Sequence, residues 1–322
     1  MSRVLLTIGD PNGVGPELAA KSVAALGDAA PVVVGDRCAI EPYAAASGLQ
    51  IRAAQRDVPA EAGVCDLVDT RILSADQLRT GEVHSAAGAA TLEYVKAAVE
   101  LSTQAYAGIV AGPHSETAVN AAGIPFAGYP PFIADLTGIE PDHAFLMLIG
   151  GGLRIVHATL HMSMAEALQR LDTDLVVEAG MALHRSLQSM GIAAPRLGMF
   201  GINCHASEGG LFGDEDLRIT SPAAEQLRAS GVNITDPTGA DVLLGDPDCD
   251  GYLATYHDQG HIPVKLLAGR GAAAATVGAG VPFASVGHGP AFDIAGQGIA
   301  DPTAMLAALN LFASRTEEVV AV

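Results

Sequence analysis

The stretch that decides the fold is residues 4–34, which read VLLTIGDPNGVGPELAAKSVAALGDAAPVVV. Two short apolar runs, Val4–Ile8 and Val32–Val34, lie on either side of a stretch with helical character, Glu17–Leu26. Short apolar runs bounded by Gly, Pro or Asp are typical of buried strands. The stretch therefore predicts a strand, a helix and a second strand in succession.

The same alternation continues along the chain and predicts the fold class. Further strands are expected at Gly108–Ala111, Phe145–Leu148, Arg154–Ala158, Leu197–Ile202 and Gly251–Thr255, and further helices at Ala86–Tyr106, Met164–Leu171, Thr173–Met190 and Pro222–Ser230. This order predicts an α/β protein with a largely parallel sheet. The Gly-rich residues 149–153 between two of these strands predict a β-hairpin, whereas segment 41–85 is less regular.

Composition limits the classes of function. With 322 residues, 49% hydrophobic and 16% charged, the chain suits a globular protein of one large domain or two lobes. Its formal net charge is −19, and it has no cluster of Lys and Arg that could neutralise phosphates, so nucleic acid is not an expected partner. An anionic substrate must then be held by a few local cations, a metal ion or helix N-termini.

Cysteine usage and apolar runs bear on the compartment. The four cysteines form no C-x-x-C pair, which argues against a disulfide framework and a zinc ribbon. The N-terminal apolar run is too short for a signal peptide, and no other run would span a bilayer. We expect a cytoplasmic protein without a membrane partner.

Three of the ten histidines lie at or near the ends of predicted strands: His161 in ATLHM, His205 in GINCHASEGG and His257 in YHDQG. Open α/β sheets build their sites at the carboxyl ends of their strands. Three neutral imidazoles converging there suit a divalent cation such as zinc and leave positions open for a substrate. Taken singly, each is better explained as an unrelated polar loop residue, whereas the three together favour a shared site.

Two Gly-rich loops are candidates for binding a nucleotide. The first, GDPNGVGPE (9–17), includes Gly13 and Gly15 and joins a strand to a helix, so its backbone N–H groups could approach an anion. A simple tight turn is an equal alternative. The second, GHGPAFDIAGQGIADP (287–302), contains His288 and Asp293. An Asp there could accept both ribose hydroxyls and repel a 2′-phosphate, although the loop could also be a surface turn.

Together these segments resemble a known family. GDPNGVGPE, AGIPF (122–126), NCHASEGG and YHDQG are similar to sequences of the 4-hydroxythreonine-4-phosphate dehydrogenase family, from about Thr7 to Leu309. The resemblance implies the fold of isocitrate and isopropylmalate dehydrogenases, with a cleft between two lobes. Residues 1–126 with 257–322 are expected to form a discontinuous cofactor-binding lobe, and residues 127–256 a lobe for substrate, metal and dimerisation.

The resemblance also implies roles for individual residues. His161, His205 and His257 match the metal ligands, and His257 is expected to come from the partner in a homodimer with shared sites. One divalent ion is expected per site, with zinc first and iron, manganese, cobalt or magnesium as alternatives. His288 and Asp293 match adenosine contacts, which favours NAD over NADP.

Several positions depart from the family pattern. Tyr129-Pro130 replaces a His-Thr pair, Glu116 replaces a Lys, and Ala274–Thr276 and Ser285 stand where the family grips a phosphate. PHSETA (113–118), which includes His114, together with GYP (128–130), HDQGHIPVKLLA (257–268) and SVGHG (285–289), is similar instead to the terephthalate cis-dihydrodiol dehydrogenases. Expected substrate contacts are therefore Tyr129, Pro130, Glu116, His114 and Ser285.

The implied reaction is the oxidation of a cis-dihydrodiol carboxylate by NAD, followed by loss of CO2, which would convert terephthalate dihydrodiol to protocatechuate. Lys265 is the expected carboxylate contact or proton relay. Asp241 is expected either to support a metal ligand or to act as an acid–base group. One alternative is an NAD-dependent dehydrogenase of a 4-phosphorylated hydroxy acid, such as 4-phosphothreonate, 4-phosphoerythronate or 4-hydroxythreonine 4-phosphate. A metal- or nucleotide-binding protein without catalysis is the outside alternative.

Overall fold

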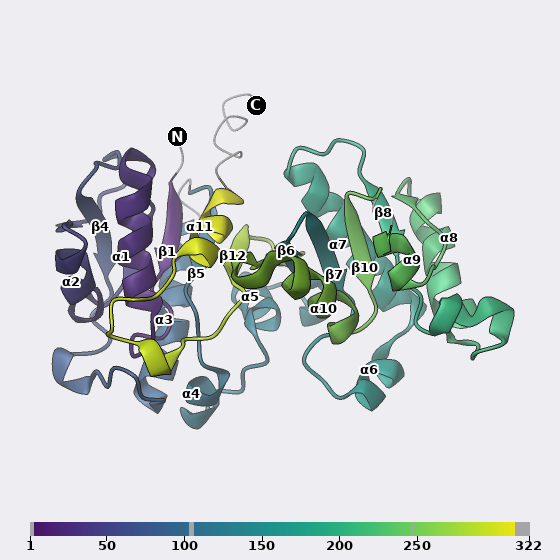
Figure 1. Cartoon of the computed structure of the whole chain (residues 1–322), viewed down its shortest axis with the longest axis horizontal. Helices are drawn as coiled ribbons and strands as arrows, with labels where there is room; N and C mark the ends of the chain where they lie inside the picture. The colour runs from purple at the N-terminus through teal and green to yellow at the C-terminus, as the bar shows by residue number, and fades with distance from the viewer. Residues whose placement is uncertain (1–2, 103–105, 246–247, 313–322) are drawn as a thin grey trace. The chain divides into compact units, whose positions relative to one another are not determined.

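The computed structural model describes residues 3–102, 106–245 and 248–312 (Figure 1). The described residues form two compact units. The first contains the residues up to Ala127 and those from Val281 onward, and the second lies within Gly128–Gly280. The α/β class with mostly parallel strand pairing is confirmed, while the cleft between two lobes stays a prediction.

The first unit has a parallel sheet in the order β3-β4-β2-β1-β5-β12. Its strands are β1 (Val4–Thr7), β2 (Val32–Gly35), β3 (Gln50–Ala53), β4 (Val64–Asp69), β5 (Gly108–Ala111) and β12 (Phe283–Val286). Its helices are α1 (Gly15–Leu26), α2 (Arg37–Ala46), α3 (Ser85–Ser102), α4 (Glu116–Ala121) and α11 (Thr303–Asn310). The sequence predicted that helix α3 runs to Tyr106; residues 103–105 lie outside the described residues, and Tyr106 is not helical.

The second unit has a mixed sheet in the order β11-β6-β7-β10-β8-β9. Its strands are β6 (Phe145–Gly150), β7 (Leu153–His157), β8 (Arg196–Met199), β9 (Asn233–Ile234), β10 (Gly251–Ala254) and β11 (Ala273–Val277). Its helices are α5 (Tyr129–Thr137), α6 (Met164–Arg170), α7 (Thr173–Ser189), α8 (Ser221–Ala229), α9 (Ala240–Gly245) and α10 (His257–Ala268). The pairs β11–β6 and β6–β7 are antiparallel, and the others are parallel.

The predicted hairpin is present, with its first strand two residues longer than expected and its second strand shifted by one residue. Gly150 pairs with Leu153, so only Gly151 and Gly152 form the turn. Both have positive φ, at 59° and 83°, which a two-residue turn of this hand requires and glycine adopts without strain.

One predicted boundary is wrong. Residues 257–280, assigned from the sequence to the cofactor lobe, belong to the second unit. β11 pairs with β6 over five residues, from Ala273↔Ile149 to Val277↔Phe145. Helix α10 lies so close to β7 that a Cβ on Gly260 would meet the His157 ring at 2.4 Å. These pairings join residues far apart in sequence, which is why a linear reading misassigned the segment.

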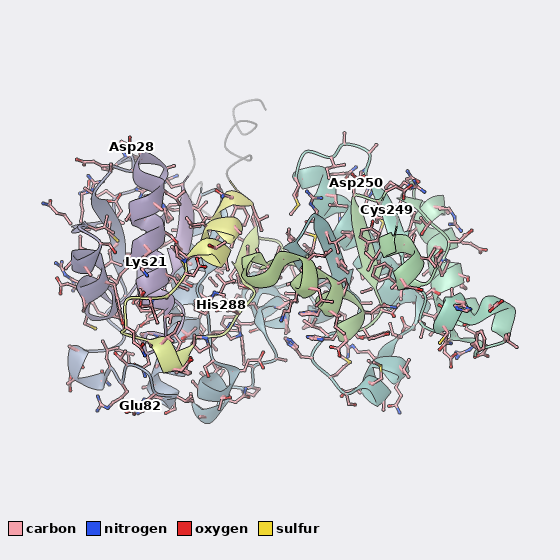
Figure 2. All side chains as sticks on the ribbon, in the orientation of Figure 1. Lys21, Asp28, Glu82, Cys249, Asp250 and His288 are labelled. Atoms are coloured by element: carbon pink, nitrogen blue, oxygen red, sulfur yellow. The ribbon has the colours of Figure 1, made fainter. Side chains whose placement is uncertain are left out.

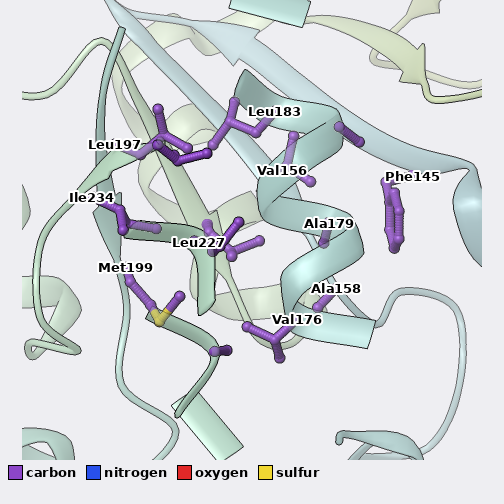
Figure 3. Close-up of a cluster of buried hydrophobic side chains, with 14 of the residues drawn as sticks. Phe145, Val156, Ala158, Val176, Ala179, Leu183, Leu197, Met199, Leu227 and Ile234 are labelled. Carbon is purple, nitrogen blue, oxygen red and sulfur yellow. The ribbon is translucent and has the colours of Figure 1, made fainter. Parts of the chain in front are cut away.

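One hydrophobic core of the second unit lies between its sheet and helices α7 and α8 (Figure 3). Leu183 and Leu187 of α7 and Leu227 of α8 are fully buried against Leu197 and Leu253 of the sheet. This packing fixes the strands whose ends carry the candidate site. Among the described residues, no helix is long and apolar enough to cross a membrane.

Candidate active site

The order of the strands brings the loops of the three candidate ligands to one edge of the sheet. β10 lies between β7 and β8 and is parallel to both, with Ala254 opposite His157 and Leu253 opposite Met199. Carboxyl ends of adjacent parallel strands share an edge. The segments that follow these strands carry His161, His257 and His205, as the sequence predicted.

Four histidine rings gather at this edge. The His161 and His257 centroids are 5.7 Å apart, His257 stacks on His261 at 3.7 Å, and His261 lies 4.6 Å from His157. His157 and His261 were not predicted from the sequence. His261 could have been found, because the spacing of four residues from His257 places both on one face of a helix. His157 lies at the end of a buried strand and has no local signal.

His157 and His261 are neutral members of the cluster. Burial lowers the pKa of His157 to about 4 and that of His261 to about 2. His157 Nδ1–H donates to the Leu146 carbonyl at 3.2 Å, and its Nε2 accepts from Nδ1–H of His261 at 3.0 Å. This chain of hydrogen bonds assigns one tautomer to each ring. Neutral, hydrogen-bonded imidazoles suit a support for a cation site, because they add no positive charge.

His205 lies in an unusual loop. His205, Ala206, Ser207, Glu208 and Gly209 all have positive φ, between 43° and 69°. This conformation costs L-residues about 1–2 kcal/mol each. The side chain of His205 is 70% exposed, and its Nδ1 lies 3.0 Å from Glu208 Oε2. Among the described residues, no three His, Cys, Asp or Glu side chains form a group that could hold a metal ion, so one chain brings together His161 and His257 without His205.

The donor set nevertheless fits a divalent ion. His257 Nδ1 lies 2.6 Å from Asp258 Oδ1, as His205 Nδ1 lies near Glu208. A carboxylate at Nδ1 holds an imidazole with its Nε2 lone pair outward, the arrangement that metal-binding histidines favour. His161, His257 and His205 would therefore hold the ion if a second copy of the chain completes the set.

The other predicted residues of the second unit differ in how they lie relative to the four histidines. Lys265 is exposed on α10, two turns after His257, and its charge helps to lower the pKa of His261. Gly128 lies so close to His161 that a Cβ there would be 3.3 Å from Nδ1, which places the start of α5 beside the cluster. Asp241 is exposed in the first turn of α9.

Tyr129 and Pro130, which the sequence predicts as substrate contacts, lie inside the second unit. Both are buried, and Tyr129 is only 3% exposed. They form the first turn of α5, which packs against β6 and β11. Their effect on a substrate would therefore pass through the shape of the region beside His161.

The remaining predicted substrate contacts belong to the first unit. Ser285 is buried in β12. The ring of His114 makes an edge contact with the ring of Phe126, with 5.1 Å between the centroids. Glu116 is exposed at the start of α4, whose N-terminus is capped by Ser115 accepting from Ala118 N at 3.1 Å.

The two predicted cofactor loops pack against each other in the first unit. Val14 N donates to Pro290 O at 2.9 Å, and a Cβ on Gly13 would lie 2.5 Å from the Pro290 side chain. A Cβ on Gly15 would meet Ile8 O at 1.9 Å, so both glycines are sterically required. His288 and Asp293 are exposed in the second loop. The loops are thus side by side, as a shared nucleotide site requires.

Helix α1 fastens the second loop. Lys21 Nζ donates to the carbonyls of Gly298 and Ala300 at 3.0 and 2.7 Å, and Glu17 Oε1 accepts from Ala300 N at 2.8 Å. Figure 2 shows Lys21 on α1 and His288 in the C-terminal segment of the same unit. These bonds hold residues 298–300 in place and limit the freedom of the loop that carries Asp293.

Asp10, in the first loop, is fully buried. Its Oδ1 accepts from Asn12 N at 2.9 Å, whereas Oδ2 has no hydrogen-bond partner among the described residues. Burial raises its pKa from 3.8 to about 6. The folded state holds the Asp10 proton more tightly than the unfolded state does. The contribution of Asp10 to the free energy of unfolding therefore falls as the pH rises from about 4 to above 6.

We therefore expect Asp10→Asn to remove a pH-dependent loss of stability. The free energy of unfolding of the variant minus that of the wild type should be roughly 2–3 kcal/mol larger at pH 8 than at pH 4. This estimate uses about 1.4 kcal/mol per unit of pKa shift. Urea unfolding at both pH values measures this difference. If the free energy of unfolding changed with pH in the same way in both proteins, the pKa of Asp10 would not be raised.

Several known proteins are similar to this chain along nearly its whole length. The chain is 44% identical over 315 residues to a 1,2-dihydroxy-3,5-cyclohexadiene-1,4-dicarboxylate dehydrogenase of a Comamonas species, covering 97% of this chain and 98% of that one. A crystal structure of a terephthalate 1,2-cis-dihydrodiol dehydrogenase from Burkholderia xenovorans LB400 matches with 49% identity and a TM-score of 0.73, covering 98% of each chain. A 4-hydroxythreonine-4-phosphate dehydrogenase from Klebsiella pneumoniae matches with 32% identity and a TM-score of 0.87, covering 98% of this chain and 99% of that chain.

These relatives share one class, since all three are named dehydrogenases. Residues 27–312 also match the family model described as pyridoxal phosphate biosynthetic protein PdxA. The chain belongs to this PdxA family, so the family resemblance seen in its sequence is confirmed.

Proposed function

We propose that the chain is a metal- and NAD-dependent dehydrogenase that oxidises terephthalate cis-dihydrodiol and releases CO2 to give protocatechuate. The observation that carries this proposal is the 44% identity, over 97% of the chain, to a dehydrogenase named for a cyclohexadiene diol dicarboxylate. The substrate of that relative has the diol and the two carboxylates that the proposed reaction needs.

The chain's own residues have distinct tasks in this proposal. The metal held by His161, His205 and His257 would supply Lewis-acid chemistry. Lys265, on the same helix as His257, offers an exposed ammonium to a substrate carboxylate or a proton in transit. Asp241, exposed at the start of α9, is proposed as an acid–base group.

The surroundings of Glu116 favour an unphosphorylated substrate. Ser115 already caps the N-terminus of α4, and the Glu116 carboxylate occupies its first turn. An anion at a helix N-terminus gains from unpaired N–H groups and the helix dipole. Here one of those N–H groups is occupied and a negative charge is present, so a phosphate gains less. The similarity to a 4-hydroxythreonine-4-phosphate dehydrogenase keeps a phosphorylated hydroxy acid as the second candidate.

The test compares catalytic efficiencies for terephthalate dihydrodiol, its isophthalate analogue and 4-phosphorylated hydroxy acids. We expect the terephthalate dihydrodiol to win by more than tenfold, about 1.4 kcal/mol of transition-state binding. Glu116→Lys should improve the efficiency for phosphorylated acids. Glu61→Lys makes the same substitution at another exposed position, distant in the sequence, and should not. A phosphorylated acid winning with the wild type would select the second candidate.

For the cofactor, we expect a preference for NAD over NADP that depends on Asp293. Its exposed carboxylate can pair with ribose hydroxyls and repels a 2′-phosphate. Asp293→Ser should reduce the NAD/NADP ratio of kcat/KM by roughly tenfold, as expected for losing about 1.4 kcal/mol of discrimination. Asp57→Ser, which removes another exposed carboxylate of the same unit, is the control. An unchanged ratio in Asp293→Ser would place the ribose elsewhere.

We also propose that the protein is a homodimer with shared sites. Large apolar side chains are exposed beside the candidate ligands: Leu211 (70%), Phe212 (46%) and Leu217 (51%) near His205, and Ile262 (54%), Leu266 (78%) and Leu267 (64%) on α10. Phe212 contacts the His205 ring at 5.8 Å between centroids. Clustered exposed apolar side chains are typical of association surfaces. A second copy that covers them would also bring a missing ligand to the His161–His257 pair.

A further inference from the structure

The loop that carries His205 is held by one buried carboxylate. Asp216, at the start of the π-helical turn Asp216–Thr220, is 1% exposed. Its Oδ1 accepts from Ile202 N and Thr220 Oγ1, both at 2.7 Å. Its Oδ2 accepts from Asn203 N at 3.0 Å and from Ser207 Oγ at 2.8 Å. Four donors thus converge on one side chain.

These donors come from both sides of His205. Ile202 and Asn203 precede it, and Ser207 follows it at the centre of the left-handed run. A run of L-residues with positive φ persists only where the surroundings determine it. Asn203 adds two bonds within the same network, to Ser207 Oγ at 3.2 Å and Glu215 Oε2 at 2.6 Å.

We infer that Asp216 is a positioning residue for His205: by holding both sides of the loop, it fixes the direction of the imidazole and so sets the affinity for the metal ion. This inference rests on the proposed function. Asp216 itself is turned into the protein, since both of its oxygens are occupied by donors of the chain. Its effect on the ion must therefore pass through the backbone of residues 202–207.

An amide at this position cannot replace the carboxylate. The side chain of an asparagine would have one acceptor oxygen for two pairs of donors. In either orientation of the amide, its NH2 group would face a backbone N–H, from Ile202 or from Asn203. Asp216→Asn therefore loses the bonds of one oxygen and sets its NH2 group against one backbone N–H. The matched control is Asp214→Asn, which removes the same charge two residues away. The Asp214 carboxylate is 66% exposed and pairs with Arg218 at 3.0 Å.

A second pair of variants separates positioning from stability. Ser207→Ala and Thr220→Val each remove one hydroxyl that donates to Asp216, but Ser207 lies in the His205 loop and Thr220 in the helical turn. Both should lower the free energy of unfolding of the metal-free protein. Only Ser207→Ala should weaken the binding of Zn²⁺.

The experiment is competition titration of the purified full chain with Zn²⁺, alongside urea unfolding without metal. We expect the Zn²⁺ dissociation constant to rise at least tenfold in Asp216→Asn and severalfold in Ser207→Ala, and to change less than twofold in Asp214→Asn and Thr220→Val. His205→Ala gives the limit for complete loss of this ligand.

Wild-type affinity in a folded Ser207→Ala and a folded Asp216→Asn would overturn the inference. If Asp216→Asn does not fold, the comparison of Ser207→Ala with Thr220→Val decides it, and equal Zn²⁺ affinities in that pair contradict the positioning role. Failure of the proposed function is distinguishable, because the wild type itself would then bind Zn²⁺ no better than His205→Ala.

Discussion

Replacing His257 by alanine should reduce kcat/KM by roughly a thousandfold or more, because Lewis-acid stabilisation is worth several kcal/mol and each 1.4 kcal/mol is a factor of ten. The same loss is expected for His161→Ala and His205→Ala. Steady-state assays with NAD and the dihydrodiol, before and after treatment with a chelator, measure it. Added Zn²⁺, Mn²⁺ or Co²⁺ should restore the chelated wild type and none of the variants.

The control is His143→Ala, which removes a half-exposed histidine of the same unit that pairs with Glu178 at 3.1 Å. It should retain nearly full activity, because exposed pairs contribute little to stability. Full turnover by a metal-stripped wild type in the presence of chelator would refute the role of the ion.

Mixing inactive variants should restore activity if the sites are shared. Three mixtures are possible from His161→Ala, His205→Ala and His257→Ala. If one ligand comes from the partner, two mixtures should recover to about a quarter of wild-type activity, because half of the dimers are mixed and each has one intact site. The mixture that fails names the two ligands contributed by the same chain.

The geometry and the family resemblance differ on which mixture fails. His161 lies beside His257 within one chain, which predicts that His161→Ala with His257→Ala stays inactive. The resemblance places His257 in the partner, which predicts that His161→Ala with His205→Ala stays inactive. His205→Ala with His257→Ala should recover in either arrangement. Exchange is verified with differently tagged chains, and no recovery in any mixture after exchange would show that each chain builds its own site.

Much of the fold could be predicted from local patterns. Strands such as β1, β2 and β10 are buried on both faces and therefore appear as continuous apolar runs, which Gly, Pro and Asp bound. The edge strand β3, QIRA, was not predicted, because its polar and partly exposed residues give no such run. β4 lies in the same irregular segment, 41–85, and α2 extends into it; both were missed with β3.

The sequence by itself determined the α/β class, the family and the positions of His161, His205 and His257 after strands, because each of these depends on neighbouring residues or on motifs with a fixed order. Only the tertiary structure decided that β10 lies between β7 and β8, that His157 and His261 join His257, and that Asp216 holds residues 202–207. Strand order and burial arise from pairings between residues more than a hundred positions apart, such as Phe283 with Ile109 and His261 with His157. Those pairings are selected by how well whole elements pack together, which no short stretch of sequence specifies.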